Sequence, residues 1–287
     1  MRLRYTTRPL HPDFGIEIEG CDLSQPLSDA QFGEIRLLYD KHSVVAIRGQ
    51  HLSPSAQVAF LRRFGTPKIS QRKEFHLAGA PEIGKVGNTK NPDGTPAAFL
   101  DRVGDLWHTD TSSDSHIDAV TMLYCVQTPA EGGDTLFCSM HAAYDTLQAA
   151  MRGKIADLTV VHSFNKHNDA LLAKNKGSAR PLSAEDRAKW PDRVHKVVQS
   201  HPVTGRPHYF VSPTLVTTFS GLDEDQSAAL ADELISHATQ AGRVYRHKWR
   251  GGDLVFWDNR AAMHSATPAN YKGGERLMHR AYAYTNR

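Results

Sequence analysis

Short runs in which apolar and polar residues alternate recur along much of the chain and predict a fold rich in β-strands. Alternation with a period of two places apolar side chains on one face of a strand. The first such run is 15–20, and 43–48 is a short apolar run typical of a buried strand. Later runs rich in Val, Tyr, Phe and Thr occupy 116–125, 133–138, 158–164, 197–201, 207–211, 244–249, 254–257 and 277–284.

Four segments show helical periodicity instead. Ser28 with Gln31 three residues later forms a capping box, which predicts a helix start. Ser53 followed by Pro54 predicts a second start, because serine is a good N-cap and proline suits the first helical position. Two further helices are predicted at 141–152 and 223–241.

Many short strands with few helices between them indicate a mainly β fold with flanking helices and a sandwich or jelly-roll core. A chain of 287 residues can form one such domain, and we expect a single domain over 1–287. The segment 66–107 is irregular, and 165–196 is a polar segment rich in Lys and Arg. Long irregular segments are often functional, so each is a candidate lid, although 165–196 is equally well explained as a polar surface excursion.

The net charge and the cysteine content limit which partners and which cellular compartment are expected. The formal net charge is only +3 and no dense basic run occurs, so neither nucleic acid nor a membrane is an expected partner. A mildly basic protein suits small anionic molecules. The three cysteines form no C-x-x-C pair, and the N-terminal residues lack the apolar core of a signal peptide, so we expect a cytoplasmic protein.

The best candidate for a chemical site is the stretch Trp107-His108-Thr109-Asp110. In an extended segment the side chains at i and i+2 leave the backbone on the same side, so His108 and Asp110 can bind one metal ion. A third ligand is expected from His264, which follows an apolar strand and a polar turn. Two imidazoles and one carboxylate form the facial triad of non-haem Fe(II) oxygenases. The same ligands also suit zinc, so a zinc hydrolase is an alternative.

Four ordered motifs make the first interpretation more specific. They are WHTD at 107–110, PAEGGDT at 129–135, WDNRAAMH at 257–264 and ERLMHR at 275–280. Together they resemble the Fe(II)/2-oxoglutarate dioxygenases of the taurine dioxygenase and 2,4-dichlorophenoxyacetate dioxygenase superfamily, over nearly the whole chain. The resemblance implies Fe(II) bound by His108, Asp110 and His264, with 2-oxoglutarate as co-substrate and O2 as oxidant.

The resemblance also implies roles for three further residues. Arg276 matches the family arginine that binds the distal carboxylate of 2-oxoglutarate, a task that suits a planar guanidinium. Thr135 matches the threonine that hydrogen-bonds the same end. Arg280 matches an arginine that binds the acid group of the substrate in taurine dioxygenase, and it lies on the same face of a strand as Arg276. Pairing of Arg280 with a buried carboxylate such as Asp258 is the alternative.

The expected activity is therefore hydroxylation of a small anionic substrate, with a carboxylic acid of the aryloxyalkanoate kind as the first candidate. Cleavage of the hydroxylated product follows if the hydroxylated carbon bears an ether oxygen. Desaturation or hydroxylation of a natural-product or amino-acid intermediate is the alternative within the same chemistry. Asp110 argues against halogenation, because halogenases of the family carry a small residue at this position. Relatives often form dimers or tetramers, so we expect a homo-oligomer.

Overall fold

The computed structural model describes residues 5–70, 72–99, 106–114, 119–173, 180–268 and 274–285. Parts of both candidate lid segments and the first residues of the strand expected at 116–125 lie outside these ranges. The helices are α1 (Asp29–His42), α2 (Pro54–Arg62), η1 (Lys73–Phe75), α3 (Met140–Asp145), α4 (Ala149–Ile155), α5 (Phe164–Ala173), α6 (Ala184–Lys189), α7 (Glu224–Ala238) and η3 (Ala241–Arg243). The strands of the N-terminal half are β1 (Thr6–Pro9), β2 (Ile16–Glu19), β3 (Val44–Ile47), β4 (Gly65–Lys68), β5 (His76–Leu77), β6 (Ala80–Gly87), β7 (Ala119–Gln127) and β8 (Thr135–Ser139). Those of the C-terminal half are β9 (Thr159–His162), β10 (Arg193–Lys196), β11 (Val198–Ser200), β12 (Pro207–Tyr209), β13 (Val216–Phe219), β14 (Val244–His247), β15 (Leu254–Asp258), β16 (Ala262–Ala266) and β17 (Leu277–Thr285).

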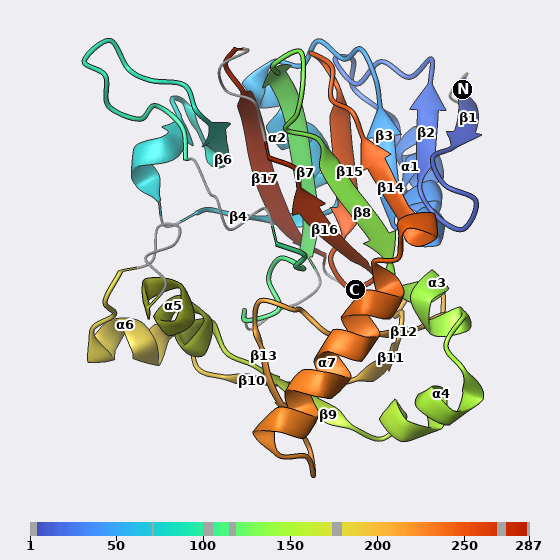
Figure 1. Ribbon diagram of the computed structural model, residues 1–287. Coiled ribbons are helices and arrows are strands. Elements are labelled where there is room, and N and C mark those ends of the chain that lie inside the picture. The colour runs from blue at the N-terminus through green and yellow to red at the C-terminus, as the bar shows by residue number, and fades with distance from the viewer. Residues whose placement is uncertain are drawn as a thin grey trace.

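Extensive sheets form the framework, as the sequence predicted in outline. The largest has the strand order β1-β2-β3-β15-β7-β17-β6-β5, with β4 also paired to β17. A second sheet has the order β14-β8-β16, and smaller sheets are formed by β10-β9-β13 and β11-β12. In Figure 1 the β14-β8-β16 sheet lies in front of the large sheet, and α1 and α2 lie behind it.

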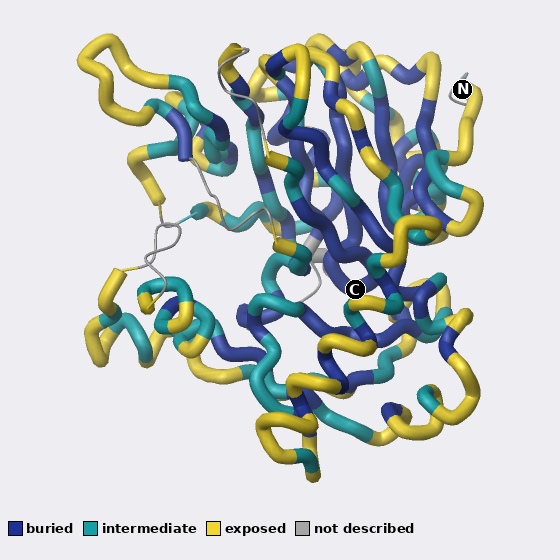
Figure 2. Tube along the Cα trace, in the orientation of Figure 1, coloured by how far each residue is buried: buried dark blue, intermediate teal, exposed yellow. Residues whose placement is uncertain are grey.

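The two larger sheets pack face to face, and alternation along β15 shows how. Leu254 and Phe256 belong to an apolar cluster on the side of α1 and α2, whereas Val255 and Trp257 belong to a cluster shared with Phe137 of β8. A strand with both faces covered is apolar throughout, which explains the uninterrupted run Leu254–Trp257. The other face of the β14-β8-β16 sheet packs on α3 and α7 through a third cluster, which includes Met263. Buried residues follow these strands in Figure 2.

The capping signals located two helices correctly. Ser28 accepts a hydrogen bond from the backbone of Gln31 at the start of α1 and the full capping box is present. Ser53 caps α2, with Pro54 in its first turn. The single helix expected at 141–152 was wrong: α3 and α4 are separate. The Thr146 hydroxyl donates to the carbonyl of Ala142 at 2.8 Å, a backbone contact typical of residues that compete with helix continuation.

The expectation that 66–107 is irregular was also wrong for its described part. β4, η1, β5 and β6 lie there, and β6 pairs with β17 on one side and β5 on the other. Its sequence APEIGKVG carries two glycines and no regular alternation, so the pairing depends on β17 rather than on a local pattern. No helix in the described part of the chain is long and apolar enough to cross a membrane.

Candidate metal centre and active site

Two backbone hydrogen bonds place His108 directly opposite His264. The amide of each residue donates to the carbonyl of the other at 2.9 Å, which makes an isolated antiparallel bridge between the loop before β7 and strand β16. Opposed residues of an antiparallel pair bring their side chains together. The two imidazole centroids are therefore 4.1 Å apart. His108 is extended as expected, but the contact is this single bridge rather than a strand, and Asp110 already begins a turn.

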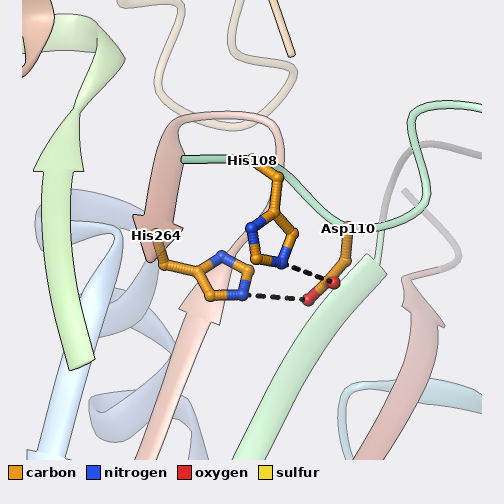
Figure 3. Close-up of side chains that lie close together, drawn as sticks. All are labelled: His108, Asp110 and His264. Atoms are coloured by element: carbon orange, nitrogen blue, oxygen red, sulfur yellow. Dashed lines mark ion pairs between the residues drawn. The ribbon is translucent and has the colours of Figure 1, made fainter. Parts of the chain in front are cut away.

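The three predicted ligands converge in the structure (Figure 3). One ligand atom from each of His108, Asp110 and His264 lies within 4.8 Å of the others, and they are the only such group among the residues described. The Nε2 atom of His108 is 3.8 Å from Oδ1 of Asp110, and Nε2 of His264 is 3.7 Å from Oδ2. These separations are too long for hydrogen bonds. They suit atoms that bind a common ion at roughly 2.0–2.2 Å.

The protonation states at this cluster also suit a metal. The Nδ1 atom of His108 lies 2.7 Å from the carbonyl of Leu106, and because a carbonyl only accepts, Nδ1 carries the proton and Nε2 presents its lone pair. Burial, together with the nearby His108, lowers the pKa of His264 to about 3, so this imidazole is neutral at physiological pH. Burial alone would raise the pKa of Asp110, but His264, His108 and Arg280 bring it below its usual value.

An Fe(II) ion fits these residues. Two neutral imidazole nitrogens and one carboxylate form a facial donor set, and imidazole and carboxylate are ordinary ligands of ferrous iron. The Nδ1 atom of His264 is buried with no hydrogen-bond partner among the described residues, so packing rather than a hydrogen bond orients this ring. Trp257 and Phe137 supply that packing, with ring centroids 4.6 and 6.2 Å from the imidazole.

The turn Asp258–Arg260, which lies between β15 and β16, is hydrogen-bonded. The guanidinium of Arg260 donates to both oxygens of Asp258 at 2.8 and 2.5 Å, and the ring of His201 contacts the same carboxylate at 2.9 Å. Burial alone would raise the pKa of Asp258, but Arg260 and His201 hold it well below its usual range. Asp258 is thus paired with Arg260 and His201, whereas the charge of Arg280 acts on Asp110.

Arg280 lies on the face of β17 that looks toward the candidate metal centre. Its charge contributes to lowering the pKa of both Asp110 and His264. The neighbouring positions Ala281 and Ala283 belong to the cluster on the opposite, helix-covered side. The guanidinium carbon lies 5.4 Å from the ring centroid of Tyr282, which is two residues further along the same face.

Thr135 is a near neighbour of His264 across the small sheet. It opposes Ala266, and His264 opposes Phe137, so the side chains of Thr135 and His264 are diagonal neighbours on one face. Thr135 is buried, and its hydroxyl accepts a hydrogen bond from the indole of Trp249 at 3.0 Å. Because the hydroxyl oxygen is the acceptor there, its own proton can be donated to a ligand.

Arg276 is buried just before β17, and its backbone is held by the end of β6. Its amide donates to Oδ1 of Asn88 at 2.7 Å, and the amide of Asn88 donates back to the carbonyl of Arg276 at 3.1 Å. Gly87 lets the two segments approach this closely, since a Cβ there would lie 1.7 Å from the carbonyl oxygen of Arg276. The φ of Gly87, 152°, is also one that L side chains rarely adopt.

A polar cluster that the sequence did not suggest lies on the same face of β17 as Arg280. Lys68 forms an ion pair with Asp114, and the hydroxyl of Tyr284 donates to the same carboxylate at 3.1 Å. Burial raises the pKa of Tyr284, so its hydroxyl keeps its proton. These contacts join β4, β17 and the segment after Asp110. No sequence signal could have found them, because the partners are brought together only by strand pairing.

Comparison with known proteins places this site in a family. Residues 6–282 match the family described as "Taurine catabolism dioxygenase TauD, TfdA family". The chain is 34% identical to the alpha-ketoglutarate-dependent 2,4-dichlorophenoxyacetate dioxygenase of Cupriavidus pinatubonensis, over 89% of this chain and 90% of that protein. It is 31% identical to the (S)-phenoxypropionate/alpha-ketoglutarate-dioxygenase of Delftia acidovorans, over 92% and 90%. The crystal structure of AAD-2 in complex with Mn(II) and N-oxalylglycine superposes with a TM-score of 0.83 at 27% identity, covering 98% of this chain and 99% of that one.

The protein belongs to the TauD/TfdA family of dioxygenases. It is an alpha-ketoglutarate-dependent dioxygenase, an oxidoreductase whose family chemistry uses Fe(II), 2-oxoglutarate and O2. The zinc-hydrolase alternative is set aside by this assignment.

Proposed function

We propose that the enzyme hydroxylates a small carboxylic acid of the aryloxyalkanoate class. The observation that carries this proposal is Arg280, a cation on the inward face of β17 whose charge reaches Asp110 and His264. A guanidinium there can bind a substrate carboxylate with two parallel hydrogen bonds and hold the neighbouring carbon beside the metal. The names of the two relatives above, both enzymes of aryloxyalkanoic acids, support this substrate class.

In this proposal His108, Asp110 and His264 hold Fe(II). The iron, with 2-oxoglutarate and O2, supplies an oxidant strong enough for an unactivated C–H bond. The chain contributes binding, orientation and exclusion of water. If the hydroxylated carbon carries an ether oxygen, the product is a hemiacetal, which breaks into an alcohol or phenol and a carbonyl compound.

Arg276 and Thr135 are proposed to bind the distal carboxylate of 2-oxoglutarate. Arg276 supplies a buried cation, and Thr135 supplies a hydroxyl whose proton is free to be donated because Trp249 donates to its oxygen. Hydrogen bonds between charged partners are stronger than neutral ones, so this pair can fix the co-substrate as well as attract it. Asn88 and Gly87 then serve by holding the backbone of Arg276 in place.

Several further features belong to the same proposal. The face-to-face sheets are consistent with a double-stranded β-helix, or jelly roll, in one domain spanning 1–287. The family resemblance supports a homo-oligomer. Cys21, Cys125 and Cys138 are all buried and unpaired, which supports a reducing, cytoplasmic setting. The segments 66–107 and 165–196, parts of which lie outside the described residues, are proposed as lids over the site.

The substrate class is tested with a panel of acids at fixed 2-oxoglutarate. Phenoxyacetate, 2-phenoxypropionate, an aliphatic ether acid, taurine and an amino acid are each incubated with Fe(II)-loaded enzyme. We expect succinate release to rise with the aryloxy acids and to match phenol release one to one. Turnover of taurine alone would reject the carboxylic-acid assignment, and an oxidised product without phenol would favour desaturation or simple hydroxylation.

A pair of arginine variants tests the two carboxylate sites against each other. Arg276→Ala should raise the KM for 2-oxoglutarate by roughly 10- to 100-fold, the usual effect of losing a hydrogen-bonded charged partner. Arg280→Ala should raise the KM for the substrate by a similar factor and change the KM for 2-oxoglutarate little. Each variant is the matched control for the other. Equal effects of Arg280→Ala on both constants would place this arginine in the co-substrate site or in the fold.

A further inference from the structure

A chain of hydrogen bonds runs from the core to the metal-facing carboxylate of Asp110. The indole Nε1 of Trp257 donates to Oδ1 of Asn259 at 3.0 Å, and Nδ2 of Asn259 donates to the hydroxyl of Thr121 at 2.8 Å. The Thr121 hydroxyl then donates to Oδ2 of Asp110 at 2.8 Å. These three core residues have relative exposures of 0–1%.

The chemistry of the groups fixes the direction of every bond in this chain. An indole N–H can only donate, so the atom of Asn259 that it meets is the amide oxygen. The backbone amide of Asp110 also donates to this oxygen at 3.2 Å, which fixes the same orientation independently. The amide NH2 therefore faces Thr121, whose hydroxyl accepts from it and is left with one proton to give. That proton goes to the carboxylate of Asp110, which only accepts.

The hydroxyl of Thr121, which donates to Asp110, is also held in a fixed position. Thr121 lies on β7, directly opposite Trp257 of β15 and Tyr282 of β17. A β-branched side chain in a central strand has few rotamers available. The turn after β15 is also hydrogen-bonded to the segment that carries Asp110, because the hydroxyl of Thr109 donates to the carbonyl of Asn259 at 2.5 Å. Asn259 thus hydrogen-bonds directly to the segment that carries Asp110. Through Thr121 it is also linked to the side chain of Asp110.

We propose that Thr121 is a positioning residue that orients the Asp110 carboxylate for metal binding. Its hydroxyl engages Oδ2, which also lies 3.7 Å from Nε2 of His264, while Oδ1 lies 3.8 Å from Nε2 of His108. The hydrogen bond thereby fixes the rotation of the carboxylate between the two imidazoles. The inference rests on the proposed metal site and adds a residue that neither the sequence motifs nor the metal ligands include.

The test is the affinity for Fe(II) alone, measured by anaerobic calorimetry without 2-oxoglutarate or substrate. Thr121→Val removes the hydroxyl and keeps the shape, and should weaken Fe(II) binding by roughly 10- to 100-fold, as loss of outer-sphere support typically does. Thr121→Ser keeps the hydroxyl and should bind close to wild type. Comparing Fe(II) binding by Thr121→Ala and Thr121→Ser repeats the test with two side chains that are both smaller than threonine. Thr217→Val is the control, because the hydroxyl of Thr217 donates to a backbone carbonyl in another sheet, at 3.2 Å.

The outcomes separate this inference from the proposal on which it rests. Wild-type protein that binds no Fe(II) would overturn the metal site itself. Wild-type binding together with unchanged affinity in Thr121→Val would overturn only the role of Thr121. Equal weakening in the serine and valine variants would show that keeping the hydroxyl does not preserve Fe(II) binding, and would also overturn it. At saturating Fe(II), the KM for 2-oxoglutarate should stay unchanged in Thr121→Val, because Arg276 and Thr135 are untouched.

Discussion

His264→Ala is expected to abolish tight Fe(II) binding and to lower turnover at least about a thousandfold, equivalent to about 4 kcal/mol of transition-state stabilisation. The same result is expected for His108→Ala and Asp110→Ala. Each variant removes one of the three proposed ligands from a site whose candidate donor atoms lie within 4.8 Å of one another. Two remaining ligands cannot hold the ion on one face, so activity falls with metal occupancy.

Metal content measured after anaerobic loading and desalting, together with 2-oxoglutarate-dependent succinate release, checks this result. His279→Gln is the matched control, since His279 is also a partly buried histidine, but its ring lies 3.1 Å from the side chain of Gln57 and outside the cluster. This variant should keep its iron. Full iron content in any of the three ligand variants would reject the assignment of that residue.

In the metal-free protein, four buried or partly buried histidines outside the candidate metal centre are expected together to remove about 4 kcal/mol of folding free energy between pH 7 and pH 5.5, about 1 kcal/mol each. Burial lowers the pKa of His141 and His279 to about 4, and that of His162 and His208 to about 3. In the unfolded chain these groups titrate near their ordinary value of about 6.5. Below that pH the unfolded state binds more protons, so stability rises with pH and is lost on acidification.

Urea unfolding of chelator-treated protein at several pH values measures this slope. His279→Gln should remove the contribution of one histidine, about 1 kcal/mol over this pH range, because that group no longer titrates. His51→Gln, at an exposed histidine, is the matched control variant. A stability that does not vary between pH 5.5 and pH 7 would contradict the burial of these four imidazoles.

Local chemistry explains which parts of the fold the sequence could predict. Ser28 with Gln31, and Ser53 with Pro54, are signals that act within a few residues, and both helices begin where these signals lie. β6 carries no such signal, because its pairing is fixed by β17 nearly two hundred residues later in the chain. β16 was not recognised as a strand either, since it is short and follows a tight turn. Its identity depends on pairing with β8.

The residues of the candidate site likewise include some that a sequence signal predicts and others that no local signal predicts. His108, Asp110 and His264 could be proposed because metal ligands follow a spacing and a motif order that the sequence displays. The role of Thr121 could not, because a threonine in an apolar strand is ordinary until Asn259 and Asp110 are seen on either side of it. Lys68 and Asp114 form an ion pair that likewise depends on distant strands. Hydrogen-bond partners that meet only after folding leave no local pattern.

The bridge between His108 and His264 couples iron binding at the proposed site to folding. In the unfolded chain the two imidazoles are separated by more than half of the sequence, and only folding brings the segment that carries His108 opposite β16. An ion that needs both imidazoles binds the native state alone, and its binding free energy is added to the folding free energy. If these residues hold iron as proposed, loss of iron lowers the folding free energy as well as the activity, and a smaller fraction of the protein is folded when iron is scarce.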